Sequence, residues 1–263
     1  MLTGMTEQDW LITLEVFDAV QSRRGEPGHD DRKFLEAIQY FTVHSITWRA
    51  LPREFGNWNS VWKRFWRLSR SGVFEAFFQM LAEFSDTAHL VQFFDSTTVR
   101  AHVSAAGAKG GSSIRPSADR VAAFRPKSTS RPISTDLDGN PLDFHLTPGE
   151  ASDSTQFETS LDIGPDIRPR IAVTDKGYDS DANRAAALAR GITPVIPRRE
   201  NSKQRGRFFP KRLYKLRARI EQTIGKLKRF KRVAMRCEKT DISYSAIISF
   251  ACGLILVKSV HTA

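Results

Sequence analysis

Residues 90–99 read LVQFFDSTTV and residues 170–180 read RIAVTDKGYDS. Both runs are apolar and β-branched, which is typical of buried strands, and we expect the strands to end near Asp95 and at Asp175. A carboxylate at a strand end emerges at the edge of the sheet, where open α/β folds bind ligands. Taken singly, an aspartate in this position often only begins a turn. Evidence from other parts of the sequence is needed to tell a ligand-binding carboxylate from an aspartate that begins a turn.

The chain after residue 89 predicts further strands and helices. In chain order these are a strand at 141–149 entered through the turn DLDGN, a helix capped by Ser180 or Asp181 and ended by Gly191, a strand at 192–197, and one long helix at 213–230. Strands that come first and then alternate with helices predict a mixed α/β sheet with helices on its faces.

The helix predicted at 213–230 has apolar and polar residues on different faces. Its apolar stripe, the face that has to be buried, consists of Leu213, Leu216, Ile220, Ile224 and Leu227. Beside it lies a polar stripe roughly 60° wide, which holds Tyr214, Arg217, Glu221 and Lys228. A solvated ion pair would explain Arg217 and Glu221, which are four residues apart. It would not explain why the one interior acid of a very basic segment lies beside the buried face.

Positive charge is concentrated in one part of the chain. The net charge is +11, but residues 198–236 hold sixteen Lys or Arg against two acids, so this segment carries +14 and the remainder −3. Such a stripe is expected of a contact with a phosphate backbone, and Arg229, Lys231 and Arg232 are candidate DNA contacts within it. The alternative is a solvated basic helix, although solvated faces usually mix both signs of charge.

The composition indicates a soluble globular protein, with 40% hydrophobic and 26% charged residues. Cys237 and Cys252 form no disulfide framework, which favours a reducing compartment. The start of the sequence lacks the basic and apolar regions of a secretory signal. The longest apolar run, at 246–257, is short for a membrane span and suits a buried helix. We therefore expect a cytoplasmic protein.

The first 88 residues predict helices rather than strands. Their apolar residues recur at helical spacing at Trp10, Leu11, Leu14, Phe17 and Val20, and again at Phe34, Ile38, Phe41 and Val43. A short helix after Pro52 should end at Gly56, and a helix rich in Trp, Arg and Lys should begin after Asn57. This pattern fits a helix-turn-helix reader of the DNA major groove. It fits a plain helical hairpin with its tryptophans packed inward equally well.

Three acids are candidate metal ligands: Asp95, Asp175 and Glu221. Carboxylates that converge on one place repel each other unless a cation is present. Hard oxygen ligands without a nearby His or Cys select Mg²⁺ or Mn²⁺ over zinc. A site of this kind beside a basic groove suits two-metal phosphodiester chemistry, in which one ion activates water or a 3′-hydroxyl and the other stabilises the leaving oxygen.

These residues fall within motifs that resemble bacterial insertion-sequence transposases of the DDE class. The motifs are DKGYDSD at 175–181 and the spacing Y-x2-R-x3-E-x6-K at Tyr214, Arg217, Glu221 and Lys228. Further matches are WRALPREFGNWNSVWKRFWRLSRSGV at 48–73, FDSTTVRAH at 94–102, LTPGEASDS at 146–154 and RARIEQTIGKLKRFKRVAMRCEKT at 217–240. The resemblance covers nearly the whole chain, and the four-residue signature is its most specific part.

The resemblance implies an RNase H-like catalytic domain at 89–263, preceded by a helical DNA-binding region at 1–88. It implies metal-dependent cleavage and strand transfer of insertion-sequence ends, with Asp95, Asp175 and Glu221 as ligands of Mg²⁺ or Mn²⁺. Tyr214, Arg217 and Lys228 are implied as contacts to the DNA end. The expected partners are double-stranded DNA, as transposon ends and target, and further copies of the chain on that DNA, in association with the nucleoid. A stand-alone RNase H-like nuclease is the rival enzyme, although it would need neither the end-binding signature nor the N-terminal helices.

One segment departs from the family. Where relatives read Gly-Gly-Phe-Ser-Thr-Lys-Ile-His-Leu, residues 122–130 read AAFRPKSTS. One DNA sequence encodes both strings in frames offset by one base, so we infer compensating frameshifts around Ser112 to Ile133. Pro126, Pro132 and the lost alternation predict an irregular segment at 112–133. A harmless surface loop is the alternative. If the segment is damaged, this copy only binds DNA and is catalytically poor.

Overall fold

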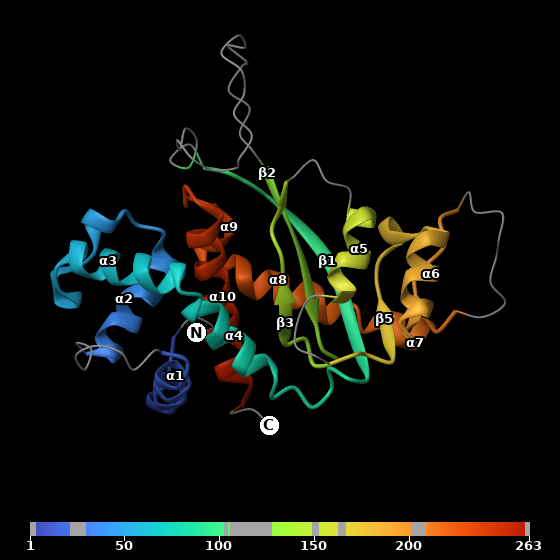
Figure 1. The fold of residues 1–263 in the computed structure, drawn as a ribbon, viewed down its shortest axis with the longest axis horizontal. Helices are drawn as coiled ribbons and strands as arrows, with labels where there is room; N and C mark the ends of the chain where they lie inside the picture. The colour runs from blue at the N-terminus through green and yellow to red at the C-terminus, as the bar shows by residue number, and fades with distance from the viewer. Residues whose placement is uncertain are drawn as a thin grey trace, which may run out of the picture.

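The computed structural model describes residues 4–21, 30–102, 105, 128–148, 153–162, 167–200 and 209–260. Helices occupy its N-terminal part, as expected (Figure 1): α1 (Glu7–Val20), α2 (Asp31–His44), α3 (Trp58–Arg70) and α4 (Val73–Ala82). Short 3₁₀ turns at Trp48–Ala50 and Arg53–Phe55 lead to Gly56, and Asn57 caps α3 by accepting a hydrogen bond from the backbone of Asn59.

The tryptophans of α3 do not all pack inward. Phe65 and Leu68 are buried, whereas Trp62 is 38% and Trp66 47% exposed. The expectation of a hairpin with its tryptophans turned inward is therefore wrong for these two residues. α1, α3 and α4 pack against the C-terminal helix α10 (Asp241–Val260) and share one hydrophobic core with it. The division of the chain at residue 88 stays a prediction.

The sheet has the order β3-β2-β1-β5-β6. Its strands are β1 (Val91–Arg100), β2 (Ser128–Thr135), β3 (Pro141–Phe144), β5 (Ile171–Val173) and β6 (Thr193–Val195), and β4 (Thr147–Pro148) also pairs with β2. β1, β2 and β3 are antiparallel, whereas β1, β5 and β6 run parallel. This mixed sheet, flanked by helices, confirms the predicted RNase H-like fold class.

Helices cover both faces of the sheet (Figure 1). α8 (Ala218–Lys228) packs on β1 and β2, and α10 packs on β3, while α5 (Asp153–Asp162) packs on β1 and β2 and α6 (Asp181–Ala189) on β6. Successive side chains of a strand point to opposite faces of the sheet, so neighbouring residues of β1 pack into different cores. Phe93 belongs to the core that includes α8 and α10, and Phe94 to the smaller core that includes α5 and α6.

α10 is long and apolar enough to span a membrane by length and composition alone, but 72% of its apolar stretch is buried inside the protein. It packs mainly against α4, where an added Cβ at Gly253 would clash with the ring of Phe77. The apolar run at 246–257 therefore lies in a core helix, as the sequence indicated.

Three predicted elements differ from those observed. β1 continues to Arg100 and does not end near Asp95, because β2 pairs with it as far as Arg100 after β5 has ended. The strand expected at 141–149 is interrupted at His145 and Leu146 between β3 and β4. The long helix expected at 213–230 is divided into α7 (Lys211–Lys215) and α8.

The division between α7 and α8 shifts the predicted faces. Arg217 N–H donates to the carbonyl of Tyr214 at 3.0 Å, and Ile220 N–H to that of Arg217 at 3.1 Å. Bonds between residues three apart wind the chain more tightly than an α-helix, so side chains rotate away from their expected positions. Leu216 is consequently 38% exposed, although the sequence placed it on the buried stripe.

The expectation of an irregular segment at 112–133 is wrong for residues 128–133, which form most of β2; residues 112–127 lie outside the described ones. Pro132 lies opposite Ser96 of β1, and its carbonyl accepts a hydrogen bond from His145 at 3.1 Å. The N–H that proline lacks would point the same way, toward the interruption between β3 and β4. The ladder to β1 is therefore undisturbed, and a proline is tolerated inside the sheet.

Candidate active site

Asp95 and Asp175 lie at the same end of two neighbouring parallel strands. Phe93 of β1 and Val173 of β5 are the last paired residues, and each aspartate follows two positions later. β5 stops there, which leaves one side of β1 open next to Asp95. Since side chains alternate along a strand, Asp95 points to the same face as Phe93, the face that α8 covers.

Asp175 is held by the turn that follows β5. Its Oδ1 accepts a hydrogen bond from Gly177 N–H at 2.8 Å and caps the short 3₁₀ helix Lys176–Tyr178. A Cβ at position 177 would lie 2.9 Å from this oxygen, closer than real Cβ contacts come. The glycine of DKGY therefore makes room for the carboxylate.

Glu221 comes to the site on the first turn of α8, and Arg217, just before α8, connects it to Asp95. Arg217 Nη2 is 2.7 Å from Asp95 Oδ2, and Nη1 is 2.6 Å from Glu221 Oε1. Asp95 and Arg217 are 17% and 14% exposed, whereas Glu221 is 59% exposed. The ion pair between Arg217 and Glu221, which was the alternative explanation of the sequence pattern, is present, and the sequence could not show that Asp95 shares it.

The carboxylates influence each other electrostatically. Burial raises the pKa of Asp95 above its ordinary value; the nearby charges of Asp175 and Glu221 add to this, while Arg217 and the N–H of Ser96 oppose it. Asp95 is thus a partly buried acid whose ionised form the neighbouring cation stabilises.

The donor chemistry fits a divalent metal. Three carboxylates with oxygen ligands alone suit Mg²⁺ or Mn²⁺, and the guanidinium between Asp95 and Glu221 shows that this space accepts a cation. Among the described residues, no three His, Cys, Asp or Glu side chains lie close enough together to hold an ion in this conformation. To form such a site, Asp175 would have to join Asp95 and Glu221 as the third ligand.

The predicted DNA contacts fall into different environments. Lys228, Arg229 and Lys231 are exposed, while Tyr214 is half-buried against Phe209, with 5.3 Å between ring centroids. Arg232 is wrong as a phosphate contact, because it is 6% exposed, forms an ion pair with Glu238 and donates to the carbonyl of Ile46 at 2.7 Å. Its planar guanidinium also covers the ring of Phe41 at 3.7 Å.

Sequence reasoning did not find Arg199, which fastens the turn that presents Asp175. Its backbone N–H donates to Asp179 Oδ2 at 2.7 Å, and its Nη2 donates to the carbonyl of Gly177 at 3.1 Å. In the sequence it is one of sixteen cations in the basic segment, so no local signal distinguished it.

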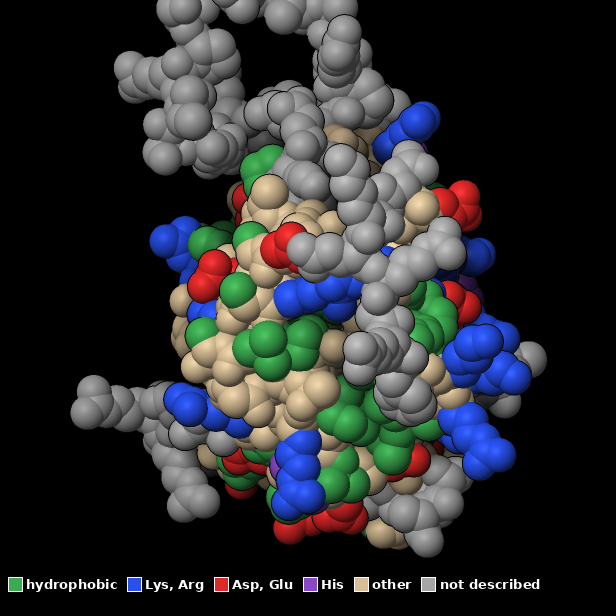
Figure 2. All heavy atoms as spheres, turned by 90° about the vertical axis from the view of Figure 1, so that its right-hand side faces the viewer, with side chains coloured by type: hydrophobic (Ala, Val, Ile, Leu, Met, Phe, Trp, Pro, Cys, Tyr) green, Lys and Arg blue, Asp and Glu red, His purple; other side chains and the backbone are tan. Residues whose placement is uncertain are grey.

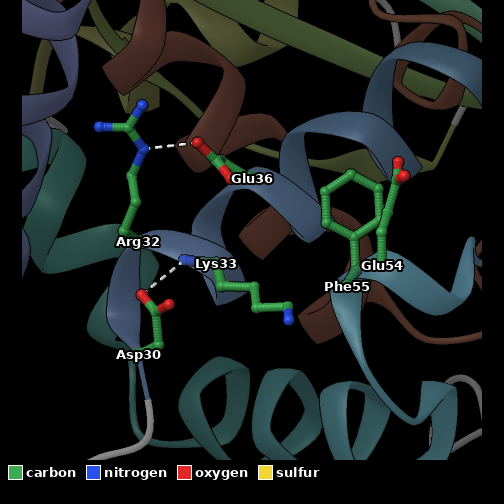
Figure 3. Close-up of a pocket in the computed structure, with 6 residues that line it drawn as sticks. All are labelled: Asp30, Arg32, Lys33, Glu36, Glu54 and Phe55. Atoms are coloured by element: carbon green, nitrogen blue, oxygen red, sulfur yellow. Dashed lines mark hydrogen bonds and ion pairs between the residues drawn. The ribbon is translucent and has the colours of Figure 1, made fainter.

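Outside the candidate site, the described residues include no cluster of three His, Cys, Asp or Glu side chains that could hold a metal ion. Figure 2, which views the end of the molecule that carries α6 and α7, shows Lys and Arg side chains as separate groups between apolar and acidic ones. The hollow in Figure 3 lies between the start of α2 and the turn at Phe55. Two of its charged residues, Arg32 and Glu36, neutralise each other at 2.5 Å.

Two family models match this chain. Residues 86–256 match the family described as the transposase DDE domain, and residues 5–78 match one described as a transposase of the IS4/5 family. The chain belongs to the DDE transposases. The resemblance inferred from the carboxylates and their surrounding motifs is thereby confirmed.

Individual relatives agree with this assignment. The chain is similar to a Burkholderia cepacia protein described as a transposase for insertion sequence element IS402, with 35% identity over 47% of this chain and 60% of that protein. It is also similar to a Brucella ovis protein described as a transposase for insertion sequence element IS6501, with 33% identity over 47% of this chain and 93% of that protein. The chain thus spans less than two thirds of the first relative.

Among solved structures, the catalytic domain of Mos1 mariner transposase is similar, with 11% identity, a TM-score of 0.27, and coverage of 63% of this chain and 91% of that one. A Mos1 paired-end complex with Mn is similar at 12% identity and a TM-score of 0.28, covering 83% of this chain and 84% of that one. Both likenesses are distant.

Proposed function

We propose that this protein cuts the ends of an insertion sequence and joins them to target DNA, with Asp95, Asp175 and Glu221 holding Mg²⁺ or Mn²⁺. One observation carries the proposal. Asp95 from the middle of the sheet and Glu221 from a helix far along the chain meet on one shared cation, at the strand end where Asp175 also lies.

A divalent ion bound there would activate the attacking hydroxyl and stabilise the leaving oxygen. The chain's own residues do the rest. β2 holds β1 and hence Asp95, Gly177 and Arg199 fix the turn of Asp175, and α8 brings Glu221 over the sheet. Tyr214, Arg217 and Lys228 are the proposed contacts to the DNA end.

The partner is double-stranded DNA, with two or more copies of the chain acting together on it in the nucleoid. Lys228, Arg229 and Lys231 lie exposed in and after α8, the helix that carries Glu221, and supply positive charge there. The N-terminal helices supply a second basic surface on α3, where the guanidinium of Arg70 lies 4.9 Å from the exposed ring of Trp66. We propose that α3 binds DNA, since exposed Trp and Arg side chains suit nucleic-acid contacts.

The test is cleavage of DNA that carries the insertion-sequence ends, found as inverted repeats in the flanking genomic sequence. Asp95→Asn, Asp175→Asn and Glu221→Gln should each abolish Mg²⁺-dependent cleavage while DNA binding is retained or strengthened, because negative charge near phosphate is removed. Asp86→Asn is the matched control, since Asp86 is exposed. Cleavage by the Glu221→Gln protein would show that another acid completes the site.

A second candidate is a copy that binds DNA without cutting it. The observation in its favour is β2, which has the sequence STSRPIST and buries Arg131 at 3% exposure next to the strand of Asp95. Rewriting residues 112–133 in the family's reading frame should then restore cleavage to an inactive protein. Equal cleavage by both versions would exclude this candidate.

A further inference from the structure

A guanidinium occupies the space between two candidate metal ligands. The two terminal nitrogens of Arg217 each donate to a different carboxylate, at 2.7 Å to Asp95 and 2.6 Å to Glu221. The charge of this cation is permanent, because arginine is not deprotonated in proteins. A divalent ion that bridges the same two carboxylates has to enter the space that Arg217 fills.

We propose that Arg217 is the counter-cation of the metal-free site and that a divalent metal ion binds by displacing it. The guanidinium holds Asp95 and Glu221 together before metal arrives and competes with the metal for their oxygens. This rests on the proposed function, because it takes Asp95 and Glu221 to be metal ligands. It goes further by assigning Arg217 a positioning role that precedes any contact with DNA.

The burial of Asp95 explains why a cation is needed beside its carboxylate both before and after metal binds. Asp95 is 17% exposed, and a carboxylate removed from water is costly unless it is paired. Glu221 is 59% exposed and is solvated by water on its own. Arg217 is thus required mainly by Asp95, and any replacement for it has to bring positive charge to the same carboxylate.

The arginine is also placed so that it can leave. Its Nε is buried without a hydrogen-bond partner among the described residues, so this donor contributes no hydrogen bond that would stabilise the arginine in this position. It lies between α7 and α8, where the chain departs from α-helical winding. Once displaced, its planar fork is available to a phosphate, which it can bind through two parallel hydrogen bonds. One residue can therefore serve the carboxylates before metal binds and the DNA end afterwards.

The experiment measures Mn²⁺ binding by the full chain without DNA, from the electron paramagnetic resonance signal of free Mn²⁺. Arg217→Gln should bind Mn²⁺ about tenfold more tightly than wild type, because the competing charge is gone. Arg212→Gln is the matched control, since Arg212 is an exposed arginine five residues earlier, on α7, and the Mn²⁺ affinity of this variant should equal that of wild type. In EDTA the Arg217→Gln protein should melt below wild type, and Mn²⁺ should restore it.

Each outcome decides the proposal. Equal or weaker Mn²⁺ binding by Arg217→Gln, with wild type binding normally, would overturn the role of Arg217 and leave the proposed function standing. Absence of Mn²⁺ binding in every variant would overturn the metal-dependent function itself, and the role of Arg217 with it. If Arg217→Gln does not fold, Arg217→Lys replaces it: its single ammonium cannot hold both carboxylates in the same fork, so Mn²⁺ should bind more tightly than to wild type. Unchanged affinity in that variant would equally overturn the proposal.

Discussion

Asp95 lies directly opposite Ile133 in the antiparallel register of β1 and β2. The strand that supports this candidate catalytic carboxylate has the sequence STSRPIST, which contains a proline and a buried arginine. On either side of Ile133, Arg131 and Thr135 are buried and each has a side-chain atom without a hydrogen-bond partner in the described structure. The stability of this strand and the geometry of Asp95 are linked through the ladder between them.

Replacing Arg131 with leucine should stabilise the protein. Arg131 is 3% exposed, burial lowers its pKa, and no described carboxylate forms an ion pair with it. Its guanidinium faces the ring of Tyr244 at 5.8 Å. An apolar side chain of similar volume should raise the free energy of unfolding by about 1–3 kcal/mol. Urea unfolding measures this, with Arg170→Leu at an exposed position as the control; a loss of stability in Arg131→Leu would contradict the prediction.

Asp143 should make stability depend on pH. Burial raises its pKa to about 7 from 3.8. Below pH 3.8 the carboxyl is protonated in both the folded and the unfolded chain and contributes nothing. As pH rises toward 7, the Asp143 carboxyl ionises in the unfolded chain before it does so in the folded one. The free energy of unfolding therefore falls by up to about 4 kcal/mol.

Asp143→Asn should therefore be more stable than wild type at pH 8 and similar to it near pH 4. Thermal melting across this range measures the difference, and Asp86→Asn, at an exposed position, should show no such trend. A stability difference that does not change with pH would mean that Asp143 ionises normally in the folded protein.

Gly177→Ala should impair cleavage more than folding. The added Cβ would come within 2.9 Å of Asp175 Oδ1 and displace the carboxylate. A shift of about 1 Å in a reacting group can cost roughly 10²-fold in rate. Gly225→Ala is the matched control, because nothing lies within 4 Å of an added Cβ at this exposed position of α8, and alanine stabilises a helix by about 0.5–1 kcal/mol relative to glycine. Similar cleavage by both alanine variants would disprove the close-contact argument.

Alanine at Lys228, Arg229 and Lys231 together should weaken DNA binding and reduce its dependence on salt. Each phosphate contact contributes about 0.9 to the slope of log affinity against log salt, so the slope should fall by roughly 3. Arg168→Ala with Arg170→Ala is the control, because both are exposed and precede β5, at the opposite end of the strand from Asp175. An unchanged slope in the triple variant would place the DNA elsewhere.

The candidate site was predictable as a set of residues because its signals are local. The strand patterns before Asp95 and Asp175, and the spacing from Tyr214 to Lys228, each lie within a short stretch that hydrophobic periodicity governs. The helix cap at Ser180, which accepts from Asn183 N–H at 3.0 Å, was predictable for the same reason. These features depend on neighbours in the chain, which the sequence contains in full.

The sequence by itself determined the mixed α/β class and the family, and it singled out three carboxylates as candidates. Only the tertiary structure decided that Arg217 joins Asp95 to Glu221, that Arg232 is buried against Phe41, and that Pro132 lies inside the sheet beside the interruption at His145. Each of these depends on contacts between segments far apart in the chain. Burial and pairing of that kind come from packing the whole fold, and the local pattern of charges and apolar residues does not contain them.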